Sequence, residues 1–188
     1  MVARLLMGSV LLVGLASAQS LPKDGDLLPP TRVLAHGKAP QMRFQLLGEH
    51  DGVRTFAVVF GTGDEVLAGL TEFAETQHLG ASQVTGIGAL HGATLGWLDL
   101  EHKSYRAIVT DEQVEVTSMV GDIALLDGKP VVHVHMNLGH QDGHVTGGHL
   151  LEAFVRPTLE VIVTEYPHAL QKQRDPSTGM SLIKPQQP

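Results

Sequence analysis

The chain has 188 residues, of which 43% are hydrophobic and 18% are charged. This composition is typical of one globular domain with an aliphatic core. Its 13 Lys and Arg against 20 Asp and Glu give a formal net charge of -7, which disfavours a nucleic-acid backbone as partner unless the basic side chains cluster. The lack of cysteine excludes disulfides, thiolate metal sites and cysteine nucleophiles.

Residues 1–18 have the pattern of a secretory signal peptide. Arg4 is followed by an apolar run from Leu5 to Leu15 and by the small-x-small sequence Ala16-Ser17-Ala18. The run is too short for a transmembrane helix, which needs about 20 apolar residues. We therefore expect cleavage before Gln19, a periplasmic or secreted protein, and no stable membrane anchor after cleavage. Loss of Arg4 makes the mature chain one unit more negative.

Proline-rich segments flank the expected domain. Residues 19–41 contain four prolines and little periodicity, so we predict a flexible N-terminal arm. Residues 171–188 contain three prolines and a glycine, and we predict a flexible tail. The folded domain is then expected over residues 42–170.

The domain begins with a predicted hairpin and a predicted helix. Asp51-Gly52 separates the apolar runs 42–47 and 54–60 and is a hairpin signal. Residues 64–79 follow, with apolar side chains at helical spacing, and Thr62 or Asp64 is a suitable cap at the start. Gly80 suits the end of this helix.

The rest of the domain reads as strands separated by Gly-rich or Asp/Gly turns. They are expected at residues 84–90, 93–100, 105–110, 114–126, 131–138 and 159–165. Short strands joined by short turns favour antiparallel pairing. One helix among so many strands excludes a doubly wound parallel sheet. The predicted fold class is therefore α/β in the α+β sense, a mainly antiparallel sheet with one packed amphipathic helix.

Histidines concentrate in the last third of the chain. His133 and His135 stand two apart in a strand-like run, so both imidazoles project from the face opposite Val134. A turn containing Gly139, Asp142 and Gly143 follows, and then Gly147-Gly148, so the chain can double back and place His149 beside them. Three neutral imidazoles suit a divalent ion such as zinc and leave one position open for water or a ligand. The alternative is that the histidines only form a solvated strand face.

The other acidic and imidazole side chains give weaker signals. Glu160 lies in the next apolar run and is a candidate to orient one of the imidazoles, but surface alternation explains it equally well. We expect the scattered histidines at positions 36, 50, 78, 102 and 168 to be surface residues. For His91, which lies at a strand junction, we make no prediction between a surface and a buried position.

The ordered motifs around these histidines resemble the plants-and-prokaryotes-conserved (PPC) domain, known from plant AT-hook proteins. The resemblance covers about residues 42–165. It is carried by Gly86–Ala89, Leu95–Asp99, Glu115–Asp122, Asp127–Pro130, His133-x-His135 and Gly147–Leu150.

The resemblance implies an antiparallel sheet with a packed helix, commonly assembled as a homotrimer. It also implies that His133, His135 and His149 match the family's metal-binding histidines, usually with zinc. The fold is similar to that of acetolactate decarboxylase, an analogy that does not transfer a reaction. The Arg-Gly-Arg-Pro hook with which plant members grip DNA does not occur here.

Two classes of function follow. The first, which we favour, is an exported, metal-stabilised module that binds a small molecule or mediates assembly. The alternative is a zinc-dependent enzyme of the cell envelope, of the lyase or hydrolase type. The sequence offers no clear general base and no cluster of substrate-orienting arginines, and DNA binding is not expected.

Overall fold

The computed structural model describes residues 21–30 and 37–185. The expected signal peptide and His36 lie outside the described residues. The elements in chain order are β1 (Leu27–Leu28), β2 (Arg43–His50), β3 (Val53–Gly61), α1 (Val66–Thr76), β4 (Ala81–Asp99), β5 (Ser104–Thr110), β6 (Val114–Leu126), β7 (Lys129–Gly139), β8 (Val145–Glu165), β9 (Lys172–Arg174) and β10 (Ser181–Ile183).

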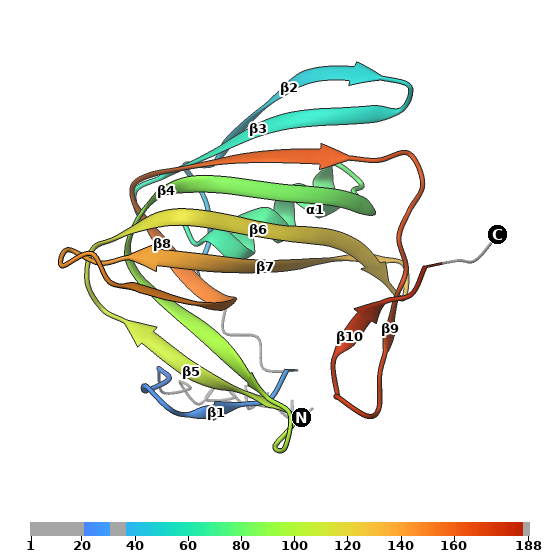
Figure 1. The fold of residues 1–188 in the computed structure, drawn as a ribbon. Coiled ribbons are helices and arrows are strands. Elements are labelled where there is room, and N and C mark those ends of the chain that lie inside the picture. Colours follow the sequence, from blue (N-terminus) through green and yellow to red (C-terminus); the bar gives the residue numbers. More distant parts are fainter. Residues whose placement is uncertain (1–20, 31–36, 186–188) are drawn as a thin grey trace, which may run out of the picture.

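The long strands β4 and β8 organise the sheet (Figure 1). Each named strand pair is antiparallel, and successive pairings of β4 with β6, β6 with β7, β7 with β8 and β8 with β4 form a closed ring. Strands β3 and β2 extend the sheet from β8, while β5 and β1 extend it from the second half of β4. Register shifts along β4 allow this strand to bend and serve both parts.

The predicted mainly antiparallel sheet with one helix is confirmed, with longer strands than expected. The runs expected at 84–90 and 93–100 form the single strand β4, because the chain bends through register shifts without leaving the sheet. The chain reverses at residues 140–144, where a turn was predicted, and Gly147-Gly148 lies inside β8 rather than in a hinge. A Cβ on Gly148 would lie 2.9 Å from the carbonyl oxygen of Gly96, so the glycine permits close approach of β8 to β4.

Helix α1 is shorter than the predicted 64–79 because Glu65 caps it. The Glu65 carboxylate accepts hydrogen bonds from the backbone N–H groups of Leu67 (3.1 Å) and Ala68 (2.6 Å), taking the role that we expected of Thr62 or Asp64. Asp64 instead binds the N–H groups of Gln41 and Gly61. At the other end, His78 has a left-handed backbone with φ of 54° and stops the helix before Gly80.

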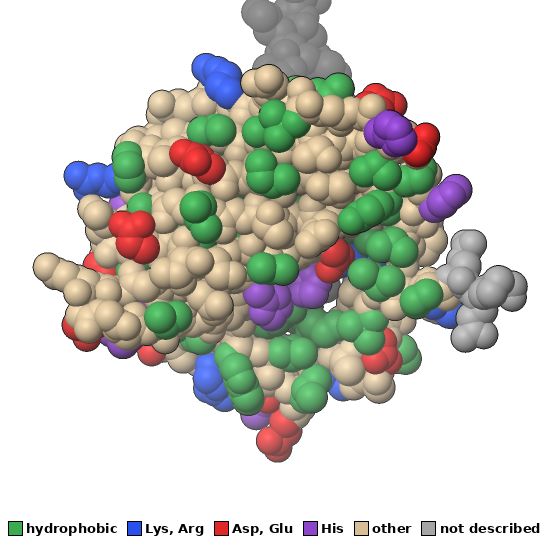
Figure 2. All heavy atoms as spheres, turned by 45° about the horizontal axis from the view of Figure 1, so that its top comes forward, with side chains coloured by type: hydrophobic (Ala, Val, Ile, Leu, Met, Phe, Trp, Pro, Cys, Tyr) green, Lys and Arg blue, Asp and Glu red, His purple; other side chains and the backbone are tan. Residues whose placement is uncertain are grey.

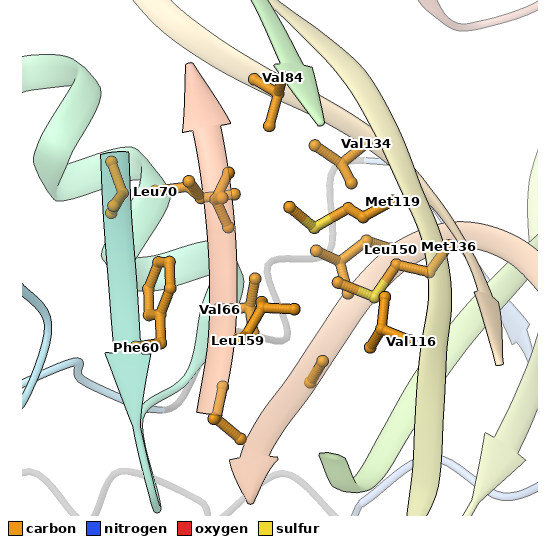
Figure 3. Close-up of a cluster of buried hydrophobic side chains, with 14 of the residues drawn as sticks. Phe60, Val66, Leu70, Val84, Val116, Met119, Val134, Met136, Leu150 and Leu159 are labelled. Carbon is orange, nitrogen blue, oxygen red and sulfur yellow. The ribbon is translucent and has the colours of Figure 1, made fainter. Parts of the chain in front are cut away.

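The core lies between α1 and one face of the sheet. Val66, Leu70 and Phe73 of the helix are fully buried, as are Val134 and Met136 of β7. Figure 3 shows Val66 and Leu70 of the helix in one cluster with Val134 and Met136 of the sheet. The burial of Val134 and Met136 leaves the residues between and beside them on the opposite face of β7, called here the outer face.

The structure places short strands in both segments for which flexibility was predicted. Leu28 of β1 is 2% exposed and its strand pairs with β5. Strands β9 and β10 form a hairpin whose base joins β6, where the N–H of Leu125 donates to the carbonyl of Leu170 (2.9 Å). Pro176 and Gly179 lie in the turn of this hairpin, and the burial of Lys172 and Met180 holds the hairpin to the domain.

The contact between β6 and β7 gives a first testable expectation. A Cβ on Gly121 would lie 2.1 Å from the backbone oxygen of His133 and 2.7 Å from Val134 Cγ2. Because the backbone cannot move aside as a side chain can, we expect Gly121→Ala to lower the free energy of unfolding by about 1–3 kcal/mol or more. Urea denaturation measures it.

The matched control is Gly48→Ala in β2, where an added Cβ meets nothing within 4 Å. This change should alter stability by less than about 0.5 kcal/mol. Equal stability of the two variants would contradict the close approach of β6 and β7.

Candidate metal centre

The three predicted histidines come together on the outer face of the sheet. His133 and His135 project from β7, and His149 of β8 stands directly opposite His135 in the strand register. Directly opposed residues of an antiparallel pair share a face, so the three rings lie on one side of the sheet. Histidine side chains gather at the edge of a hollow in Figure 2, with hydrophobic side chains around it.

The geometry of the cluster suits a single metal ion. The ring centroids are 5.2–5.4 Å apart. One ring nitrogen from each histidine lies within 4.8 Å of the other two. A zinc ion binds imidazole nitrogen at about 2.0–2.1 Å, so the three nitrogens would have to move closer together to bind one ion.

His149 is the most enclosed member of the cluster. Tyr105 stacks on its ring at 4.5 Å and 5°, over Gly96, whose lack of a side chain leaves room for the tyrosine. Burial, the neighbouring His133 and His135, and the charge of Lys172 lower the pKa of His149 to about 3. The ring is therefore neutral at physiological pH, which is the form that binds metals.

One polar atom of His149 has no hydrogen-bond partner among the described residues. Its Nδ1 is buried and accepts or donates no hydrogen bond among the described residues. A buried polar atom without a partner costs about 1–3 kcal/mol. The arrangement therefore fits a site that holds an ion or ligand which the chain does not supply, and the donor set of three imidazoles fits zinc.

Asp122 of β6 orients His133. Its Oδ2 accepts a hydrogen bond from His133 Nδ1 at 2.9 Å, and its Oδ1 forms an ion pair with Lys172 Nζ at 2.8 Å. Burial alone would raise the pKa of the Asp122 carboxyl, but these partners outweigh it and hold the pKa below its ordinary value. The carboxylate fixes the proton of His133 on Nδ1 and leaves Nε2 free to bind a metal.

Asp122 was not predicted as a site residue, although the sequence allows its position opposite His133 to be derived. Asp127-Gly128 is a two-residue turn between two apolar runs. Counting outward from it along both strands places Asp122 opposite His133, as the register has it. Lys172 had no comparable signal, because the segment that carries it reads as a tail.

Glu160 was a candidate to orient one of the imidazoles, but the strand register places it away from the three histidines. It is exposed on β8 and its neighbours in register are Val59 and Ile87. His149 pairs instead with Gly96, near the other end of β4. The register shifts along β8 and the length of the strand separate the two residues, and surface alternation accounts for Glu160.

Most of the other described histidines lie at the surface, as expected. His50, His78, His102 and His168 are exposed, and exposed His91 stacks on Phe154 at 5.6 Å. His140 differs, since its side chain is 7% exposed. Both of its ring nitrogens already have partners in Glu112 and Thr146, so it contributes nothing to the three-histidine cluster.

The family model of the Plants and Prokaryotes Conserved domain matches residues 47–167. No curated protein matches the sequence significantly. Among solved structures, a plant- and prokaryote-conserved protein from Pyrococcus horikoshii is 28% identical, with a TM-score of 0.66 over 77% of this chain and 96% of that one. A metal-containing protein from Archaeoglobus fulgidus is 31% identical, with a TM-score of 0.65 over 77% of this chain and 98% of that one.

A third similar structure is that of a proposed DNA-binding protein from Ralstonia eutropha JMP134. It is 31% identical, with a TM-score of 0.65 over 70% of this chain and 91% of that one. The chain belongs to the Plants and Prokaryotes Conserved domain family.

Within residues 21–30 and 37–185, no helix is long and apolar enough to cross a bilayer.

Proposed function

We propose that this protein is an exported, metal-stabilised module whose zinc ion, held by His133, His135 and His149, forms a small-molecule-binding or assembly site. The observation that carries the proposal is the buried, unpartnered Nδ1 of a neutral His149 among three converging imidazoles. A similar protein from Archaeoglobus fulgidus is described as metal-containing. Zinc binding would compensate the cost of collecting three imidazoles on one face.

The alternative of a zinc-dependent lyase or hydrolase rests on the open coordination position that three protein ligands leave. Zinc in such a site can polarise a carbonyl group or lower the pKa of bound water. Proton transfer also needs a positioned acid or base. Asp122, the carboxylate hydrogen-bonded to the cluster, is already engaged by His133 and Lys172, and this favours binding over catalysis.

Titration of the metal-free protein with Zn²⁺ tests the proposed centre. We expect one ion per chain, measured by calorimetry and by elemental analysis after gel filtration. Uptake well below one ion per chain would overturn the proposal.

DNA binding is not part of the proposed function. Some similar structures carry that description, but the formal net charge here is -7. The plant Arg-Gly-Arg-Pro hook is also missing from the sequence. Non-specific binding depends on basic groups that release counterions from the phosphates.

Export is proposed from the composition of residues 1–18 alone. The expected mature protein begins at Gln19 and is found in the periplasm or medium. N-terminal sequencing of protein from fractionated cells measures this. An intact Met1 on cytoplasmic protein would contradict export.

Assembly into a homotrimer is proposed from the family resemblance and from the apolar outer face. Val59, Ile87, Val120 and Ile162 are each more than 40% exposed and line a shallow pocket of about 520 Å³ on that face. Exposed apolar patches of this kind mark interaction surfaces. Light scattering should give three times the mass of one chain, and a monomer throughout the micromolar range would contradict it.

A further inference from the structure

Lys172 of β9 reaches the histidine centre from outside the family domain. The family match ends at residue 167, yet the Lys172 side chain is 3% exposed and its Nζ lies 2.8 Å from Asp122 Oδ1. The same carboxylate binds His133 through its other oxygen. Lys172 is therefore linked to a predicted metal ligand by a single carboxylate.

The hairpin that carries Lys172 is fixed to the domain at two places. Gln171 bridges to Leu125 of β6 at its base, and Leu170 donates its N–H to the carbonyl of Gly80 at 2.9 Å. Near its turn, Lys103 Nζ donates to the carbonyl of Pro176 at 2.7 Å. The ammonium group is thus held in place by the fold, since the segment contacts both β6 and the turn between β4 and β5.

The charges at this site favour an anionic ligand once a divalent ion is bound. Three neutral imidazoles add no charge to a divalent ion, and the negative charge of Asp122 is balanced by Lys172. A buried cation beside a metal centre repels the metal, so Lys172 does not improve metal binding. The unbalanced positive charge is instead suited to an anion in the open coordination position.

The surface beside the histidines indicates which kind of anion. Val120 of β6, 53% exposed, stands opposite His135 on the same face. It also lines the shallow pocket described above, whose lining includes the exposed carboxylate of Glu160 next to Ile87 in the strand register. An organic acid has a carboxylate for the metal and an apolar body for Val120, which stands next to the histidines.

We propose that Lys172 makes the histidine centre select a small organic carboxylate, bound to the metal ion with its apolar part toward Val120. The proposal rests on the metal centre of the proposed function. Lys172 acts as a specificity-determining residue through its charge, without contacting the metal.

The test uses the full-length mature protein loaded with Co²⁺, whose visible spectrum reports its ligands. Butyrate is the probe, butyramide is its neutral counterpart, and perchlorate keeps the ionic strength constant. We expect butyrate to shift the spectrum in a saturable way and butyramide to leave it unchanged. Lys172→Met should weaken butyrate binding about tenfold, which corresponds to ~1.4 kcal/mol, without lowering the affinity for Co²⁺.

Two further variants serve as controls. Lys172→Arg keeps the charge and should bind butyrate within about threefold of the wild type. Lys184→Met removes a lysine beside the same hairpin whose Nζ donates to Gln173 Oε1 at 2.7 Å, and this variant should behave as the wild type. If Lys172→Met does not fold, as judged by circular dichroism, Lys172→Gln replaces it.

The outcomes separate this inference from the metal centre itself. Equal butyrate affinity in the wild type and the Lys172→Met variant, or an equal response to butyramide, would overturn the inference alone. A loss of Co²⁺ affinity in Lys172→Met would also overturn it, because the lysine would then serve only to build the site. A wild-type protein that takes up no Co²⁺ would overturn the metal centre and the inference together.

Discussion

Replacing His135 with alanine should abolish stoichiometric zinc binding. His135 is the exposed member of the cluster, on the outer face of β7 between buried Val134 and Met136. Its loss removes one of three protein ligands without disturbing the core. Loss of outer partners of a ligand typically lowers metal affinity 10–100-fold, and loss of a ligand itself should exceed that range. Competition with a coloured zinc chelator measures the affinity.

The control for this variant is His50→Ala. His50 has an 89% exposed side chain and pairs with its neighbour Asp51 in the turn after β2, so it lies on another part of the surface. Its replacement should leave both zinc stoichiometry and zinc affinity unchanged. If the His135 and His50 variants retain the same zinc affinity, the three histidines do not form a metal centre.

The Asp122→Asn variant alters the group that orients His133 and leaves all three predicted ligands in place. An asparagine keeps the shape of the side chain but removes the negative charge that holds the proton of His133 on Nδ1. It also leaves the buried Lys172 without an ion-pair partner. The predicted ligands lie on β7 and β8, while the group that orients one of them lies on β6 and is ion-paired to a lysine of the C-terminal hairpin.

The sequence predicted the ligands better than their surroundings. The alternation of valine and histidine in residues 131–136 is sufficient to place two imidazoles on one face, because side chains of a strand alternate strictly. The position of His149 followed from the family resemblance and from the turn predicted around Gly139, Asp142 and Gly143. The chain does reverse at residues 140–144, whereas Gly147-Gly148, interpreted as a hinge, lies within β8, and the three histidines lie together.

The parts that could not be predicted depend on long-range pairing. The closed ring of strands requires β8 to pair with β4 and with β7 at different places along its length, and no local pattern specifies where a strand changes partner. Lys172 is separated from Asp122 in the sequence by the whole of β7 and β8. Its burial depends on a hairpin whose composition resembles that of a loose tail.

The acid stability of the metal-free protein should reflect the burial of His149. Burial, the neighbouring histidines and Lys172 lower its pKa to about 3 in the folded protein, whereas the unfolded chain has the ordinary value of about 6.5. Between these values the unfolded state binds the additional proton, so stability falls as the pH falls from 6.5 toward 3 and is unaffected by this group above 6.5.

Comparison of variants separates the contribution of His149 to the acid-induced loss of stability from that of the carboxyl groups. A tenfold difference in proton affinity corresponds to about 1.4 kcal/mol, so His149 should account for ~3 kcal/mol of the stability lost between pH 7 and pH 4. Urea denaturation of chelator-treated protein at both pH values gives this loss for each variant. In His149→Gln, which does not titrate, the loss should be smaller by about that amount, while His50→Gln should match the wild type. An equal loss in all three proteins would show that the His149 ring takes up a proton in the folded state, and a ring so readily protonated is not the enclosed, neutral ligand that the metal centre requires.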